Sequence, residues 1–153
     1  MIDLQFSNEL GTRDELAALK RLLSKARVQR WAAHALKVPH PADQITIRIV
    51  GESEGRELNH SYRSNVKNYA TNVLTFEYSS KPFVAADIVL CASVIEREAI
   101  EQSKTLEAHW AHLIIHGVLH AQSYDHEANE RDALEMEALE VLLMQSLGYP
   151  NPY

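Results

Sequence analysis

The sequence predicts an α+β fold with a single mixed β-sheet of about four strands, packed with about five helices. Strand-like segments occur mainly in the first 93 residues, whereas most of the remaining chain has helical periodicity. The sequence contains no internal repeat, low-complexity segment or interior linker, and 153 residues suit one hydrophobic core. We therefore expect residues 1–153 to form a single domain.

Alternating apolar and polar side chains indicate the strands, because successive residues of a strand face opposite sides of the sheet. The clearest example is QITIRIV, in which Ile45, Ile47 and Ile49 share one side. The expected strands span residues 2–6, 44–50, 71–78 and 86–93.

Apolar residues at intervals of three and four indicate the helices. Thr12 and Asp14 are candidate caps of the first helix, which ends before Pro39. The helix at 106–122 is apolar around most of its circumference, so we expect it to be the central, buried one. The expected helices span residues 15–37, 53–63, 94–102, 106–122 and 131–148.

Composition and cysteine content narrow the class of protein. With 46% hydrophobic and 24% charged residues, the chain has the composition of a soluble globular protein. It has neither the apolar run of about 20 residues that spans a membrane nor an N-terminus like a signal peptide. The single cysteine, Cys91, excludes an internal disulfide and is expected to be a buried apolar residue. We expect a cytoplasmic protein with no membrane partner.

The net charge of −6 is unevenly distributed. Residues 1–76 contain 11 Lys and Arg against 8 Asp and Glu, whereas residues 77–153 contain 4 against 13. The expected first helix has no acidic residue after Glu15, and Lys25, Arg27 and Arg30 are its candidate RNA contacts. The alternative is a basic helix face that only contacts solvent.

Three of the eight histidines fall within HGVLHAQSYDH, at positions 116, 120 and 126. On a helix, residues four apart share a face, so His116 and His120 can bind one metal ion. His126 can join them only if the chain leaves the helix and folds back. Three histidines with an open fourth position are typical of catalytic zinc, and we expect one Zn²⁺ per chain.

Other interpretations of this segment remain open. Histidine pairs at this spacing also occur on surfaces and in cores, and His109 and His112 lie near the same helical face. A His112 and His116 pair would leave His120 without a role. Gly117 occupies the position where HExxH zinc proteases carry a glutamate, which argues against a protease of that type. This glycine indicates either a close approach to the backbone at the site or tight packing of another element.

The sequence resembles the YbeY endoribonucleases of bacteria, whose hallmark is H-G-x-L-H followed by Y-D-H. The chain carries HGVLH and YDH in this register, and similar blocks extend over nearly its whole length. These blocks are LNHSYR at 58–63, TNVLTF at 71–76, DIVLC at 87–91, EAHWAHLIIHGVLH at 107–120 and EMEALE at 135–140.

The resemblance implies a zinc-dependent endoribonuclease domain specific for single-stranded RNA. It implies roles in maturing the 3′ end of 16S ribosomal RNA and in late ribosome quality control, with the ribosome or its small subunit as partner. The implied metal ligands are His116, His120 and His126, and the implied catalytic arginine is Arg63. Zinc-bound water would then attack the phosphodiester, which needs no glutamate base beside the first ligand.

The chain departs from the family pattern near the third ligand. Ser123 stands where the family usually has glycine, so the path between His120 and His126 is not fixed by the resemblance. Asp125 precedes His126 and is a candidate for orienting a ligand imidazole; the alternative is a solvated turn carboxylate.

Two rival functions are consistent with the residues alone. One is a metal-dependent hydrolase of another substrate, including a protease with an unusual base. The other is a non-enzymatic RNA- or ribosome-binding module with structural zinc, which would need a fourth protein ligand. His112, Asp125 and Cys91 are the candidates for that ligand.

Overall fold

The computed structural model describes residues 1–62, 71–122 and 129–153. In these residues, four strands form one mixed sheet in the order β1-β2-β4-β3. Strand β2 is parallel to β1 and to β4, whereas β3 pairs with β4 in the antiparallel sense. The strands are β1 (Ile2–Phe6), β2 (Gln44–Val50), β3 (Val73–Ser79) and β4 (Ala85–Cys91).

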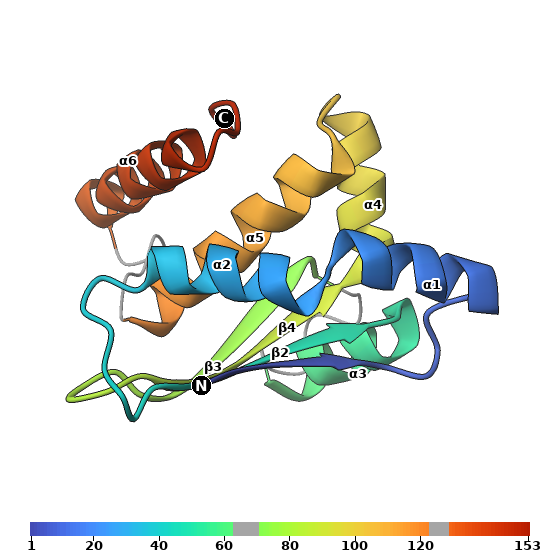
Figure 1. Ribbon diagram of the computed structural model, residues 1–153, viewed down its shortest axis with the longest axis horizontal. Helices are drawn as coiled ribbons and strands as arrows, with labels where there is room; N and C mark the ends of the chain where they lie inside the picture. Colours follow the sequence, from blue (N-terminus) through green and yellow to red (C-terminus); the bar gives the residue numbers. More distant parts are fainter. Residues whose placement is uncertain (63–70, 123–128) are drawn as a thin grey trace.

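Helices cover the sheet, and the predicted α+β fold is confirmed (Figure 1). Helices α2 and α5 lie side by side over one face, and α6 packs on α5. Helix α3 contacts β4 and α4. The helices are α1 (Arg13–Leu22), α2 (Lys25–Ala35), α3 (Glu52–Tyr62), α4 (Ala92–Glu101), α5 (Leu106–Ala121) and α6 (Glu130–Ser146).

The single helix expected over residues 15–37 was wrong, because the chain forms α1 and α2 there. Ser24 is extended, with φ −63° and ψ 149°, and its hydroxyl accepts a hydrogen bond from the Arg27 amide at 3.3 Å. A serine side chain that caps a new helix in this way competes with continuation of the preceding one. The break gives six described helices instead of about five.

The alternation along the strands sorts their side chains into two cores. Ile45, Ile47 and Ile49 are fully buried in the larger core, under α2 and α5, so their predicted common side is confirmed. Neighbouring residues face the opposite side, where a smaller apolar cluster includes Val89 and Cys91. Cys91 is buried there, as expected.

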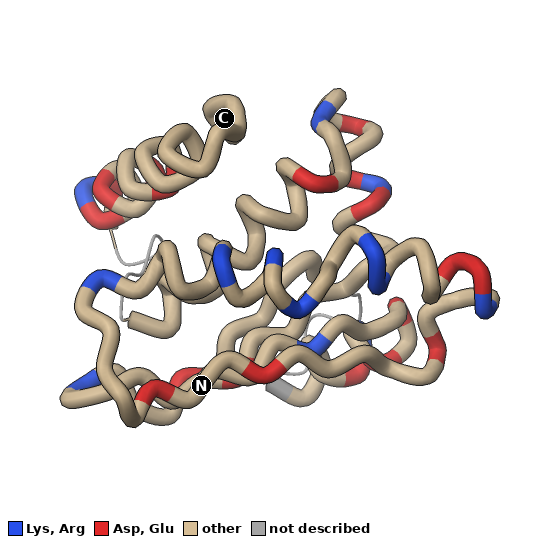
Figure 2. Tube along the Cα trace, viewed as in Figure 1, with Lys and Arg blue, Asp and Glu red and all other residues tan. Residues whose placement is uncertain are grey.

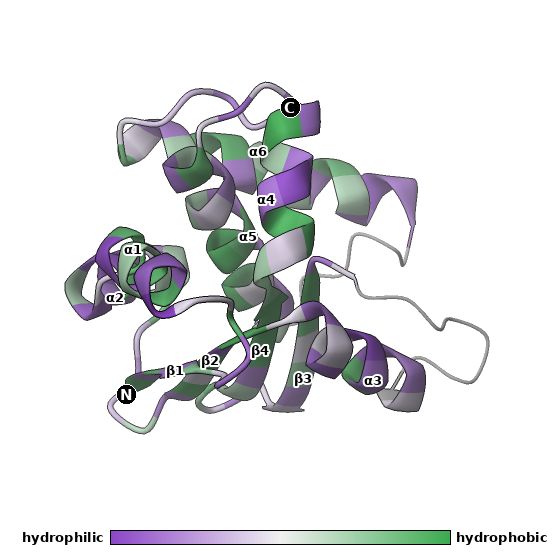
Figure 3. Ribbon diagram, turned by 90° about the vertical axis from the view of Figure 1, so that its right-hand side faces the viewer, coloured by the Kyte–Doolittle hydropathy of each residue, from purple (hydrophilic) through white to green (hydrophobic). Residues whose placement is uncertain are grey.

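Helix α5 is the central helix, as predicted, and packs between the sheet, α2, α4 and α6. The ribbon in Figure 3, coloured by residue hydropathy, shows hydrophobic residues along α5 between these elements. Thr105 caps its first turn by accepting a hydrogen bond from the Ala108 amide at 3.1 Å. Most of its sixteen residues are buried, so its position is fixed from several sides.

Gly117 lets α5 approach the sheet closely. A Cβ atom at this position would lie 2.7 Å from Cγ2 of Ile88 in β4, so the Ile88 side chain, the strand or the helix would have to shift. Of the two alternatives for this glycine, tight packing of another element is therefore the one the structure supports. The glycine brings the histidine-bearing helix against the sheet.

None of the described helices combines the length and apolar character that crossing a membrane requires.

Candidate functional site

Four histidines form a row along one face of α5. His109, His112, His116 and His120 are separated by three, four and four residues, so they lie on successive turns. The ring centroids of each adjacent pair are 6.4 Å apart. Along this row, His109 and His112 are buried, whereas His116 and His120 are partly exposed.

A carboxylate from α6 meets the middle of this row. Glu140 is 1% exposed, and its Oε1 lies 3.0 Å from Nδ1 of His116. Its other oxygen, Oε2, contacts Nε2 of His112 and lies 2.8 Å from the Tyr153 hydroxyl. Three polar groups from two other segments therefore converge on one buried carboxyl group.

The charge of Glu140 determines the direction of these hydrogen bonds. Burial by itself would raise the pKa of Glu140, but the hydrogen bonds and charges of His112 and His116 lower it to about 2. An ionised carboxylate can only accept hydrogen bonds, so both imidazoles and the Tyr153 hydroxyl must donate. Burial and the adjacent Glu140 carboxylate raise the pKa of Tyr153, which therefore stays a protonated donor.

This arrangement fits His116 as a metal ligand. Because Nδ1 of His116 donates to Glu140, Nε2 is the unprotonated nitrogen in the neutral imidazole, and that is the form that binds a metal. A carboxylate that fixes the tautomer of a ligating histidine is a common feature of zinc sites. The donor set at this end of α5 therefore suits zinc.

The competing histidines also contact carboxylates, but their rings are more deeply buried. His112 directs Nε2 at Glu140, and His109 directs Nε2 at Oε1 of Glu98, 3.0 Å away. Both rings are largely buried. Nδ1 of each ring is buried as well, whereas the rings of His116 and His120 are partly exposed. A metal ion can reach a partly exposed ring more easily, which favours His116 and His120 over His109 and His112 as the helical ligand pair.

Gln122 fixes the point at which the chain leaves α5. Its side-chain oxygen accepts from the Lys37 amide at 2.8 Å, and its side-chain nitrogen donates to the Ala35 carbonyl at 2.7 Å. The same nitrogen donates to the Val118 carbonyl at 3.1 Å. The exit from α5, two residues after His120, is thereby tied to the C-terminal end of α2.

Three predicted site residues, Arg63, Asp125 and His126, lie outside the described residues. Within residues 1–62, 71–122 and 129–153, no group of three His, Cys, Asp or Glu side chains could hold a metal ion. Of the predicted ligands, the structure therefore places only His116 and His120, on adjacent turns of α5.

The described candidates for a fourth structural ligand are both engaged elsewhere. His112 donates to Glu140, and Cys91 belongs to the smaller apolar cluster, a different core from the one that contains α5. Their positions offer no support for a closed, four-ligand structural site. Asp125 is the remaining candidate.

The predicted RNA contacts lie on α2, which runs alongside α5. Lys25 and Arg30 are exposed, but Arg27 donates to the Leu22 carbonyl at 3.0 Å and pairs with Glu107 at 3.4 Å. Figure 2 shows basic residues spaced along α1 and α2. The structure thus leaves two of the three predicted contacts exposed and gives Arg27 intramolecular partners.

Sequence reasoning missed Glu140, although its pattern contained a signal. Met136, Glu140 and Met144 are spaced four apart on α6, and both methionines are buried in the core. A carboxylate at a core position of an apolar helix stripe needs buried donors. The histidine row on α5 was the available source of such donors.

Comparisons with known proteins identify similar chains. The sequence model of a family described as Endoribonuclease YbeY matches residues 12–148. A protein from a Polaromonas species named Endoribonuclease YbeY is 59% identical over 152 residues, covering 99% of this chain and 93% of that one. A protein of the same name from Delftia acidovorans is 52% identical over 150 residues, covering 98% and 95%.

A solved structure has a similar fold. The solution structure of TM1509 from Thermotoga maritima superposes with a TM-score of 0.57 at 24% sequence identity. The match covers 97% of this chain and 92% of that chain, which supports the architecture described above.

Replacing Glu140 by glutamine tests whether the carboxylate orients His116. Glutamine offers one acceptor oxygen where three donors converge and presents N–H groups to at least one of them. We expect Glu140→Gln to lose about 1–3 kcal/mol of stability in urea unfolding. We also expect zinc affinity, measured by competition with a chromophoric chelator, to fall about 10- to 100-fold.

Glu137→Gln is the matched control, because Glu137 is exposed on the same helix. It should leave both quantities unchanged. Wild-type zinc affinity in a folded Glu140→Gln protein would show that this carboxylate does not orient a metal ligand.

Proposed function

Because this chain belongs to the YbeY endoribonuclease family, whose members hydrolyse RNA phosphodiester bonds, we propose that it is a zinc-dependent enzyme specific for single-stranded RNA. Its proposed role is maturation of the 3′ end of 16S ribosomal RNA and late quality control of the ribosome, in the cytoplasm. The observation that carries the zinc assignment is the hydrogen bond from Nδ1 of His116 to the ionised Glu140.

In this proposal His116, His120 and His126 hold one Zn²⁺ and leave a position open for reaction. A bound zinc ion lowers the pKa of a water ligand towards about 7 and acts as a Lewis acid on a phosphate oxygen. Glu140 keeps the His116 ring in one tautomer and orientation. The Gln122 hydrogen bonds hold the end of α5, two residues after His120.

The proposed catalytic arginine is Arg63, which follows directly on α3 (Glu52–Tyr62). A guanidinium group can donate two parallel hydrogen bonds to a phosphate and stabilise the negative charge that develops during cleavage. Asp125 is proposed to orient a ligand imidazole from outside the coordination sphere.

The substrate strand is proposed to lie along the basic side of α2. Lys25 and Arg30 are exposed and would contact phosphates, which supplies sequence-independent affinity. Arg27 can join them only by leaving or sharing its contact with Glu107.

Metal analysis tests the ligand set. His116→Ala, His120→Ala and His126→Ala should each lose about one equivalent of zinc, because two imidazoles bind zinc poorly. Cleavage of single-stranded RNA by the wild type should stop on chelation while circular dichroism keeps most of the folded signal. Unfolding on chelation would instead support the structural-zinc module, and full occupancy in His126→Ala would overturn the three-histidine site.

Arg63→Lys separates catalysis from folding. Lysine keeps the positive charge but not the bidentate geometry, so the single-turnover cleavage rate should fall roughly 10- to 1000-fold. Zinc content and the unfolding transition should stay as in wild type, since no metal ligand changes. An unchanged rate would remove the transition-state role, and joint loss of zinc or fold with activity would mark Arg63 as structural.

The salt dependence of RNA binding tests the basic helix. Replacing Lys25, Arg27 and Arg30 together by glutamine should flatten the log–log salt slope by about 0.7 for each phosphate that is no longer neutralised. Arg27→Gln alone should have the smallest effect of the three single changes, because Arg27 already pairs with Glu107. Arg131→Gln is the control for the single changes, because it also removes one positive charge, from an exposed position on α6. An unchanged slope in the triple variant would indicate that the basic face of α2 contacts only solvent.

A further inference from the structure

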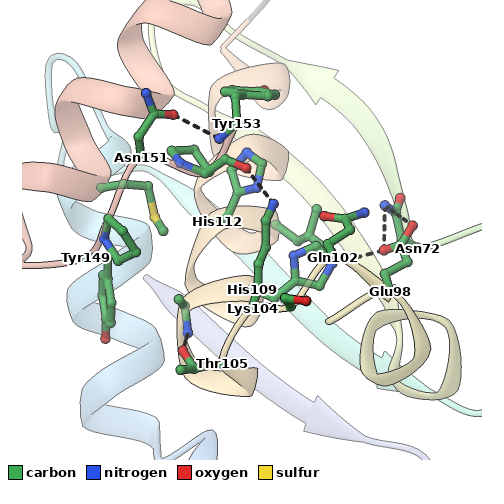
Figure 4. A pocket seen from close by; sticks show the side chains of 16 residues that line it. Asn72, Glu98, Gln102, Lys104, Thr105, His109, His112, Tyr149, Asn151 and Tyr153 are labelled. Carbon is green, nitrogen blue, oxygen red and sulfur yellow. Dashed lines mark hydrogen bonds and ion pairs between the residues drawn. The ribbon is translucent and has the colours of Figure 1, made fainter. Parts of the chain in front are cut away.

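A cavity of about 760 Å³ lies beside the histidine row, at the N-terminal end of α5. Its walls are the turn between α4 and α5, the first turns of α5 and residues 149–153, which follow α6 (Figure 4). Asn72, which directly precedes β3, closes another side. The volume is large enough for a planar heterocycle.

The walls combine rings and apolar groups with amides. Tyr149 and Tyr153 contribute aromatic rings, and Leu113 and Met144 contribute apolar surface. Gln102 presents an amide at an exposed position. Ring faces for stacking and amides for hydrogen bonding are the groups that recognise an unpaired base.

The side-chain charges of the cavity are balanced, which favours a neutral ligand group over a phosphate. Oε1 of Glu98 lies 3.0 Å from Nε2 of His109 and 3.1 Å from the Asn72 amide, and Lys104 donates to the Pro152 carbonyl. Burial lowers the pKa of Lys104 and of His109, so a second positive charge on the imidazole is disfavoured. The cavity therefore has one carboxylate and one ammonium side chain, without an excess of positive charge.

His112 connects the cavity to the candidate metal centre. Its ring lines the cavity, its Nε2 donates to Glu140, and its centroid lies 6.4 Å from that of His116. The Tyr153 ring is nearly perpendicular to the His112 ring, and their centroids are 5.4 Å apart. A strand whose phosphate reached His116 could thus place a neighbouring base at the cavity.

We propose that this cavity binds one unpaired base of the RNA substrate, next to the phosphodiester that is cleaved. The inference rests on the proposed function and adds a physical basis for single-strand specificity. A base that enters the cavity must leave its helical stack, which a base-paired strand does only at a free-energy cost. Paired RNA would therefore be a poorer substrate. This discrimination does not require a contact that recognises a particular base.

An abasic scan combined with a filled cavity tests this assignment. Ala108 lines the cavity, and Ala108→Leu would place a larger side chain in it. The probe is a single-stranded RNA with one abasic nucleotide moved through the positions around its mapped cleavage site. Single-turnover cleavage with excess zinc-loaded protein gives the half-saturating protein concentration for each RNA.

For the wild type, one abasic position within two nucleotides of the cleaved bond should raise this concentration about 5- to 100-fold, the range expected when one stacked base is removed. For intact RNA, Ala108→Leu should raise the half-saturating concentration by a similar factor. The abasic change at that position should then have no further effect on the Ala108→Leu variant. Ala138→Leu, on the exposed side of α6, should behave as wild type.

Equal responses of wild type and Ala108→Leu at every abasic position would overturn the cavity assignment. Ala108→Val supplies a smaller filling side chain if the leucine variant folds poorly, as judged by circular dichroism. Absence of RNA cleavage by the wild type would instead reject the proposed function, so the two failures are distinguishable.

Discussion

The buried carboxylate of Glu140 is the constraint on which the arrangement of the site depends. A charge that is 1% exposed is tolerated in a core only when donors surround it, and here His112, His116 and Tyr153 supply them. These donors come from α5 and from the segment after α6, so the Glu140 carboxylate fixes the position of both segments relative to α6. It also selects the tautomer of His116, which links packing directly to the chemistry proposed for this imidazole.

The rest of the fold holds α5 in place for this contact. Gly117 lets the helix approach Ile88 of the sheet, and Gln122 ties its end to α2. Packing of α5 between the sheet, α2, α4 and α6 leaves the histidine row little freedom to move. A rigid helix fixed at several points is suited to a site in which small displacements of ligands would weaken metal binding.

The four histidines of the row have different environments. His109 and His112 are buried, while His116 and His120 are partly exposed, and His112 and His116 share the Glu140 carboxylate. The buried half borders the cavity and the other half carries the proposed ligands, so the proposed sites for base and metal share one helix face. His112 borders both proposed sites, because its ring lines the cavity and its Nε2 donates to Glu140.

The sequence by itself determined the four strand segments, the apolar central helix and the common helix face of His116 and His120, because these follow from short-range periodicity. It missed the break at Ser24, where a local cap outweighs the continuing helical pattern. Only the tertiary structure decided that Glu140 serves His116 and His112, and that Gly117 meets Ile88. Those pairs join residues 24 to 29 positions apart, and the distance between such residues depends on how helices and strands pack, which no local pattern specifies.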